Sequence, residues 1–82
     1  MHELILALEQ FNREFNIDMS PTGRIDKLFE ELSELYEAHC SGTDDEIRDE
    51  SLDVLICAIQ NCIARGITNP AFGINSTLME IL

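Results

Sequence analysis

Apolar residues recur every three or four positions along two segments of the chain, which is the period of a helix with one buried face. In residues 2–15 this stripe is formed by Leu4, Ile5, Leu8, Phe11 and Phe15. In residues 22–39 it is formed by Ile25, Leu28, Phe29, Leu32, Leu35 and Tyr36. No segment alternates apolar and polar residues as a half-buried strand does. The pattern therefore predicts an all-α fold.

Capping signals predict a third helix over residues 43–65. Thr43 is a favoured N-cap residue, and Glu46 three positions later completes a capping box. Gly42 ends the preceding helix, and Gly66 lies where a helix commonly ends in a left-handed glycine. Because a short loop joins the second and third helices, we expect them to pack as an antiparallel hairpin.

The third predicted helix is apolar on every side over residues 54–63, as a central and buried helix normally is. The residues from Asn75 or Ser76 to the end carry a shorter apolar stripe and predict a last short helix. Residues 1–82 then form a single domain, a compact bundle of three to four helices. A domain of this length buries too little surface to be robust alone, so we expect a homodimer or a dimer of dimers.

The chain has 16 acidic and 5 basic residues and a net charge of −11. This charge argues against binding to duplex nucleic acid, which needs clustered Lys and Arg. No apolar run approaches the roughly 20 residues of a membrane span, and the N-terminus lacks the basic start of a signal peptide. Cys40, Cys57 and Cys62 are odd in number and contain no CxxC pair, which is typical of free thiols. We therefore expect a cytoplasmic protein that binds no membrane.

Two acidic pairs lie on the predicted hairpin, and the members of each pair are one helical turn apart. Glu31 and Glu34 are separated by about 60° around the second helix, and Glu50 and Asp53 by about the same angle around the third. Both pairs border apolar positions, and the hairpin brings them together. Either pair alone could be a solvated face, because acidic residues on helices are commonly exposed.

Asp53 gives the strongest sequence argument for a bound cation. Aspartate is unfavourable in the middle of a helix, and this one directly precedes the apolar run. A carboxylate there is costly unless it is paired or binds a metal. Four carboxylates in a small space also raise one another's pKa, and a hard cation removes the conflict. Oxygen ligands favour Mg²⁺, with Mn²⁺ as a substitute.

In their local sequence the two acidic pairs resemble those of the MazG-like all-α nucleotide pyrophosphohydrolases. The motif of that superfamily is E-x-x-E on one helix and E-x-x-D on the next, and here it is Glu31-x-x-Glu34 and Glu50-x-x-Asp53. The resemblance spans residues 25–63, about half of the chain. Relatives include dimeric dUTPases, dCTP pyrophosphatases and phosphoribosyl-ATP pyrophosphohydrolases.

The resemblance implies hydrolysis of a nucleoside triphosphate to a monophosphate and pyrophosphate, for house-cleaning or control of the nucleotide pool. It implies that all four acids of the two pairs bind Mg²⁺, that Glu30 orients or deprotonates the attacking water beside Glu31, and that Lys27 contacts phosphate. Many relatives carry further basic residues in or after their fourth helix, whereas this chain has none after Arg65. The alternatives are a MazG-like module that binds metal, nucleotide or a partner helix without turnover, and a structural helical protein with solvated acids.

Overall fold

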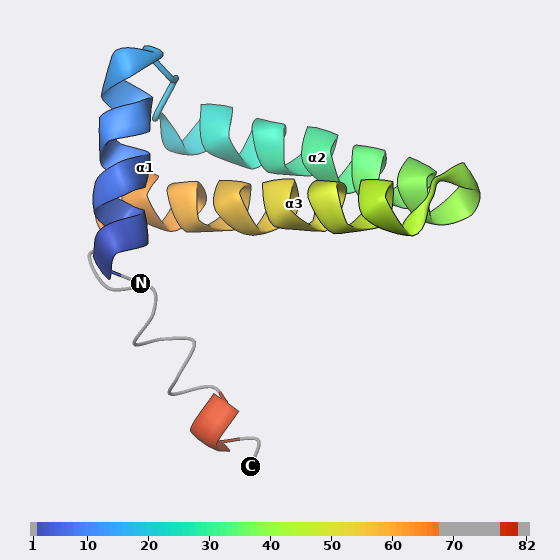
Figure 1. The fold of residues 1–82 in the computed structure, drawn as a ribbon. Coiled ribbons are helices and arrows are strands. Elements are labelled where there is room, and N and C mark those ends of the chain that lie inside the picture. Colours follow the sequence, from blue (N-terminus) through green and yellow to red (C-terminus); the bar gives the residue numbers. More distant parts are fainter. Residues whose placement is uncertain (1, 68–77, 81–82) are drawn as a thin grey trace.

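The computed structural model describes residues 2–67 and 78–80 of the chain. Within them the protein is all-α and has three helices, α1 (His2–Glu14), α2 (Pro21–Ser41) and α3 (Asp44–Ala64). α2 and α3 lie side by side and antiparallel, and α1 crosses the end of this hairpin where α2 begins and α3 ends (Figure 1). The prediction of an all-α fold with an antiparallel hairpin is therefore confirmed.

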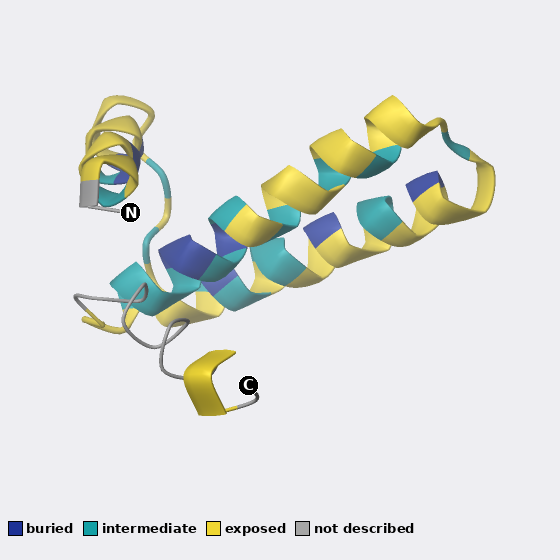
Figure 2. Ribbon diagram, turned by 60° about the horizontal axis from the view of Figure 1, so that its bottom comes forward, coloured by how far each residue is buried: buried dark blue, intermediate teal, exposed yellow. Residues whose placement is uncertain are grey.

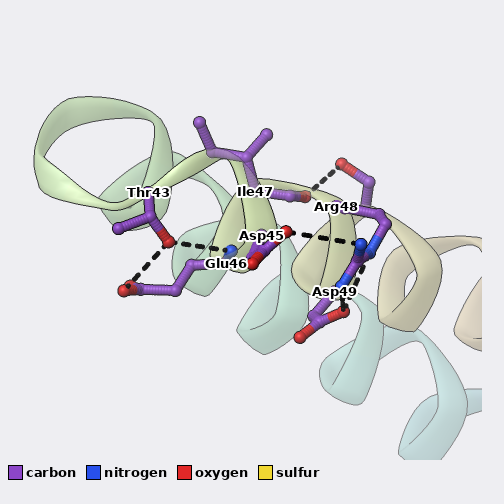
Figure 3. A network of polar contacts seen from close by, with 7 residues as sticks. Thr43, Asp45, Glu46, Ile47, Arg48 and Asp49 are labelled. Atoms are coloured by element: carbon purple, nitrogen blue, oxygen red, sulfur yellow. Dashed lines mark hydrogen bonds and ion pairs between the residues drawn. The ribbon is translucent and has the colours of Figure 1, made fainter.

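The helices begin and end close to the predicted positions, and the predicted N-cap of α3 is confirmed. Ser20 is the N-cap of α2, and its hydroxyl accepts a hydrogen bond from the backbone N–H of Gly23 at 3.0 Å. Thr43 is the N-cap of α3, and its hydroxyl accepts from the backbone N–H of Glu46 at 3.2 Å (Figure 3). These side chains satisfy backbone donors that lack a partner inside the helix.

The two glycines that follow α2 and α3 end these helices in different ways. Gly66 has a φ of 78° and donates to the carbonyl of Ile63, while Ile67 donates to the carbonyl of Cys62. This is the Schellman arrangement, and the predicted left-handed glycine is confirmed. Gly42 is instead extended, and a Cβ there would lie 2.7 Å from the backbone oxygen of Ala38. Gly42 is therefore required by close approach to the end of α2, not by a left-handed conformation.

The apolar core of the single chain is small. Among the described residues the buried apolar side chains are Leu8, Ala38, Cys57 and Ile59, and no large side chain is fully buried. Figure 2 shows exposed and half-exposed positions over most of all three helices. The prediction that α3 is a central, buried helix is wrong for one chain, since Leu55 within its apolar run is 46% exposed. One other helix and the crossing α1 cannot cover all sides of α3.

Three buried polar side chains connect the helices where α1 crosses the hairpin. Arg24 Nη1 donates to Gln60 Oε1 at 3.0 Å, and Gln60 Nε2 donates to Asn12 Oδ1 at 2.9 Å. Arg24 Nε also donates to the backbone carbonyl of Asp18 at 2.7 Å. Arginine has only donors, so it fixes the orientation of the Gln60 amide, which can then bond to Asn12. Because buried polar groups are costly unless they are hydrogen-bonded, this network holds α1 in one position on the hairpin.

The predicted last helix falls largely outside the described residues. Residues 78–80 are helical, and the rest of that prediction lies outside the described part of the chain. Within the described part, none of the helices has the length and apolar character required to span a membrane.

Candidate metal centre

The antiparallel hairpin brings acidic residues of α2 and α3 together near its middle. One carboxylate oxygen from each of Glu31, Glu50 and Asp53 can be chosen so that all three lie within 4.8 Å of one another. Oxygens on opposite sides of a Mg²⁺ ion are about 4.2 Å apart, twice the usual Mg–O distance. The three side chains therefore need only small movements to share one cation. Three of the four residues predicted as metal ligands form this cluster.

Two residues of this cluster, Glu31 and Glu50, each have a buried carboxylate oxygen that lacks a hydrogen-bond partner. Glu31 is 7% exposed, and its Oε2 accepts no hydrogen bond from any described residue. Oε2 of Glu50, which faces Glu31 from α3, is buried and unpartnered in the same way. A buried carboxylate oxygen without a donor or a cation is energetically costly. These two oxygens fit a divalent cation, because metal coordination satisfies both.

Glu34 lies beside the cluster but is not one of the three residues that share it. Its pKa is raised above the usual value, chiefly by the negative charge of Glu31 and the closeness of its carboxyl, with smaller contributions from burial, Glu50 and Glu30. Two neighbouring carboxyls resist being ionised together, so Glu34 holds its proton more strongly than an isolated glutamate. Glu34, the fourth predicted ligand, is therefore close enough to the other acids for their charges to raise its pKa.

Lys27 is the basic residue of the site. Its Nζ lies 3.0 Å from Glu31 Oε1 and 3.3 Å from Glu30 Oε1, one turn further along α2. The hydrogen bond with Glu31, and a weaker one with Glu30, raise the pKa of Lys27 above its usual value. Glu30 itself is exposed, at the edge of the cluster. The two residues assigned to water and to phosphate by the family resemblance thus lie next to the acidic cluster, in contact with each other.

The order of burial among the clustered acids differs from the one predicted from the sequence. Asp53 was expected to be the carboxylate that is costly to bury, but it is exposed. Glu31 is the buried one, because it points from α2 directly toward α3. The apolar run after Asp53 does not surround it, since α3 is only half covered. The physical case for a cation therefore rests on Glu31 and Glu50.

The donor atoms of the site are oxygens, although a thiol lies close by. Cys57 is one turn from Asp53 on α3 and is buried. Burial raises the pKa of the Cys57 thiol, and the negative charge of Glu31 raises it further. A protonated thiol is a poor metal ligand, so the available donors are hard carboxylates that suit Mg²⁺ or Mn²⁺ better than Zn²⁺.

A polar groove extends from the cluster toward the hairpin loop. It has a volume of about 260 Å³ and is lined by Glu34, Glu37, Ala38, Ser41, Glu46 and Glu50. Sequence reasoning gave no role to Glu37, yet its spacing of three residues from Glu34 is the signal that both lie on one side of α2. Because these walls are anionic, a phosphate chain can bind in the groove only together with cations.

Replacing Glu34 by Gln should stabilise the metal-free protein at neutral pH. The raised pKa means that the folded chain binds this proton more strongly than the unfolded chain does, so stability is lost as pH rises through the range just above 4.5. Glu34→Gln removes the repulsion and should melt at a higher temperature than the wild type at pH 7 in EDTA. The difference should vanish near pH 4. Glu37→Gln, which removes an acid one turn further along α2, is the control. Equal melting temperatures of Glu34→Gln and the wild type at pH 7 would contradict repulsion between Glu34 and the neighbouring acids.

Comparison of the chain with protein-family models, with curated proteins and with solved structures finds no match. The MazG-like resemblance therefore remains a prediction that rests on the doubled acidic motif and its setting.

Proposed function

We propose that the chain is a Mg²⁺-dependent nucleoside triphosphate pyrophosphohydrolase of the MazG-like kind, which releases a nucleoside monophosphate and pyrophosphate. The observation that carries the proposal is the pair of buried, unpartnered oxygens on Glu31 and Glu50, in a cluster completed by Asp53. These acids belong to the two halves of the E-x-x-E and E-x-x-D motif. The three free cysteines suit a reducing compartment, so we assign the activity to the cytoplasm.

The residues of the site have distinct roles in this proposal. Glu31, Glu50 and Asp53 would hold Mg²⁺, with Glu34 beside them as a fourth ligand. When bound, the metal neutralises phosphate charge and lowers the pKa of a water molecule. Glu30 is exposed, shares the Lys27 ammonium with Glu31, and would accept a proton from the attacking water. Lys27, on the same turn of α2, can contact an entering phosphate. Phosphoryl chemistry needs such positioning and charge stabilisation more than covalent catalysis.

A screen for pyrophosphate release tests the proposal. Purified protein is incubated at high concentration with a panel of standard and modified nucleoside triphosphates, with Mg²⁺ and separately with Mn²⁺. We expect pyrophosphate from at least one nucleotide, and none when EDTA is present. Absence of turnover on the whole panel with both metals would contradict the enzymatic proposal.

The second candidate is a module that binds metal and nucleotide without turnover. It is favoured by the absence of basic residues after Arg65, since the site then has few side chains of its own to hold phosphates. This candidate predicts that nucleotide with Mg²⁺ raises the melting temperature while no pyrophosphate appears. The same samples used in the screen therefore distinguish the two candidates.

We further propose that the protein assembles as a homodimer through the side of the hairpin opposite the acidic groove. Glu34 and Leu32 point about 160° apart on α2. The side of Leu32 carries an apolar groove of about 380 Å³, lined by Leu32, Leu35, Tyr36, His39 and Ile47. Phe29 and Tyr36, along the same side of α2, are 65% and 69% exposed. An apolar surface complements a second copy of itself, whereas two copies of the acidic side repel each other.

Light scattering should give a mass of at least twice the 9.3 kDa of one chain. Leu32→Glu introduces a charge into the apolar side and should shift the mass toward the monomer, because burying it would be costly. Glu37→Lys changes a charge on the opposite side of α2 and is the control. A monomeric wild type at micromolar concentration would contradict the proposed dimer.

A further inference from the structure

The ammonium of Lys27 is bonded to Glu31, the same carboxylate that a metal ion would bind. It bonds to Oε1 of Glu31, while Oε2 of the same carboxylate is buried and unpartnered. Among the described residues, Lys27 makes the only ion pairs with members of the acidic cluster or with Glu30. Glu31 therefore has one oxygen held by a protein cation and one oxygen without any partner.

Lys27 can leave this position easily. Its side chain is 39% exposed, so its ammonium can be hydrated when it separates from Glu31. A lysine ammonium is a compact charge on a flexible stem, unlike the rigid fork of arginine. A divalent cation bound to Glu31 would repel the ammonium about 3 Å from the same carboxylate. The two cations therefore compete for one anionic residue.

We propose that Lys27 is the resident counter-cation of the metal-free centre and that a divalent cation displaces it from Glu31. This inference rests on the proposed metal site and adds a change of state to it. Without metal, the ammonium partly neutralises the acidic cluster and supports the fold. With metal, the side chain is released toward solvent, beside the exposed Glu30. Binding of the metal thus frees a basic residue at the edge of the site.

The proposal predicts opposite effects on the two states when the charge of Lys27 is removed. Lys27→Met leaves the acids without their counter-cation, so the melting temperature in EDTA should fall. It also removes the competitor of the metal, so Mn²⁺ should bind roughly fivefold more tightly in calorimetric titration, the factor expected for loss of one partly exposed ion pair. A residue that only helped to hold the metal or the fold would not give tighter binding when it is lost.

Arg48→Met is the matched control. Arg48 is also a basic residue of the hairpin, is exposed, and pairs with Asp45 at 3.4 Å and Asp49 at 3.2 Å near the start of α3 (Figure 3). The Arg48→Met substitution removes the same charge from the chain as Lys27→Met but changes no contact of the acidic cluster. Affinity for Mn²⁺ should be higher in Lys27→Met than in Arg48→Met. Equal or weaker binding by Lys27→Met would overturn the proposal.

A second measurement needs no substitution, because Lys27 is the only lysine of the chain. Protein labelled with ¹³C at the lysine ε-carbon gives one side-chain signal by NMR. Titration with Mg²⁺ should move this signal toward that of a free lysine, with the same midpoint as Mg²⁺ binding by calorimetry. A signal that stays unchanged at saturation, or a wild type that binds neither ion, would overturn the proposal.

These outcomes are separable from failure of the enzymatic proposal, because neither readout uses turnover. Displacement of Lys27 without pyrophosphate release would support the inference about Lys27 and contradict the enzymatic proposal. Pyrophosphate release without displacement of Lys27 would support the enzymatic proposal and contradict the inference about Lys27.

Discussion

Glu31→Gln should lower the rate of pyrophosphate release at limiting Mg²⁺ by at least about a hundredfold, the upper end of what loss of an outer-shell partner costs. Glu31 is the most buried acid of the cluster, it shares the cluster with Glu50 and Asp53, and one of its oxygens lacks a partner. An amide of the same shape keeps the packing but removes the charge. Asp53→Asn should have a similar effect on the rate, although Asp53 is exposed. The rate is measured over a range of Mg²⁺ concentrations, so that weakened metal binding is separated from a slower chemical step.

Two exposed acids on the same helices provide the controls for this experiment. Asp26 lies on α2 outside the cluster and the polar groove, and Asp49 directly precedes Glu50 on α3. Asp26→Asn and Asp49→Asn change the net charge by the same amount and should keep the rate within a few-fold. The helical content of every variant is compared by circular dichroism. Equal losses in the controls, or a Glu31→Gln variant as active as the wild type, would show that the cluster is not the catalytic metal site.

Gln60→Leu should destabilise the protein by about 3 kcal/mol, because it leaves a buried guanidinium without one of its acceptors. Gln60 is 4% exposed and joins Arg24 of α2 to Asn12 of α1. For a small domain this loss is a large fraction of the total stability. The free energy of unfolding is measured by urea denaturation. Gln10→Leu, which removes an exposed amide bonded to Glu14 on α1, should change it little.

A combined variant distinguishes a buried polar network from simple loss of packing. When Asn12, Arg24 and Gln60 are all replaced by Leu or Met, no buried charge remains without a partner. The triple variant should then recover much of the stability that Gln60→Leu loses. The triple variant could instead have a lower free energy of unfolding than Gln60→Leu. Each hydrogen bond would then stabilise the fold independently, and the unpartnered guanidinium would not explain the loss in Gln60→Leu.

The period of the apolar residues and the caps were enough to predict the helices. Thr43 caps the start of α3 and Gly66 follows its end, as predicted, and the short loop at Gly42 favours an antiparallel hairpin. These signals are local, because each depends on residues within one or two turns of the chain. The same signals predicted that the two acidic pairs lie close together, because the short loop limits how α2 and α3 can align.

Burial could not be predicted in the same way, because it depends on what packs against each side. Asp53 was expected to be buried by its own helix, yet a side chain on a helix surface is covered only by another element. Glu31 is buried by α3, and Leu55 stays exposed because nothing among the described residues covers that side. The network of Asn12, Arg24 and Gln60 was missed for the same reason, since each residue alone is an ordinary surface type.

The proposed function depends on the binding of a divalent cation by the cluster of Glu31, Glu50 and Asp53. Mn²⁺ titration followed by electron paramagnetic resonance tests it directly, because free Mn²⁺ gives a strong signal that bound Mn²⁺ lacks. We expect at least one Mn²⁺ bound per wild-type chain, competition by Mg²⁺, and loss of that binding in Glu31→Gln. Stoichiometric binding that is the same in Glu31→Gln, or no stoichiometric binding to the wild type, would contradict this expectation.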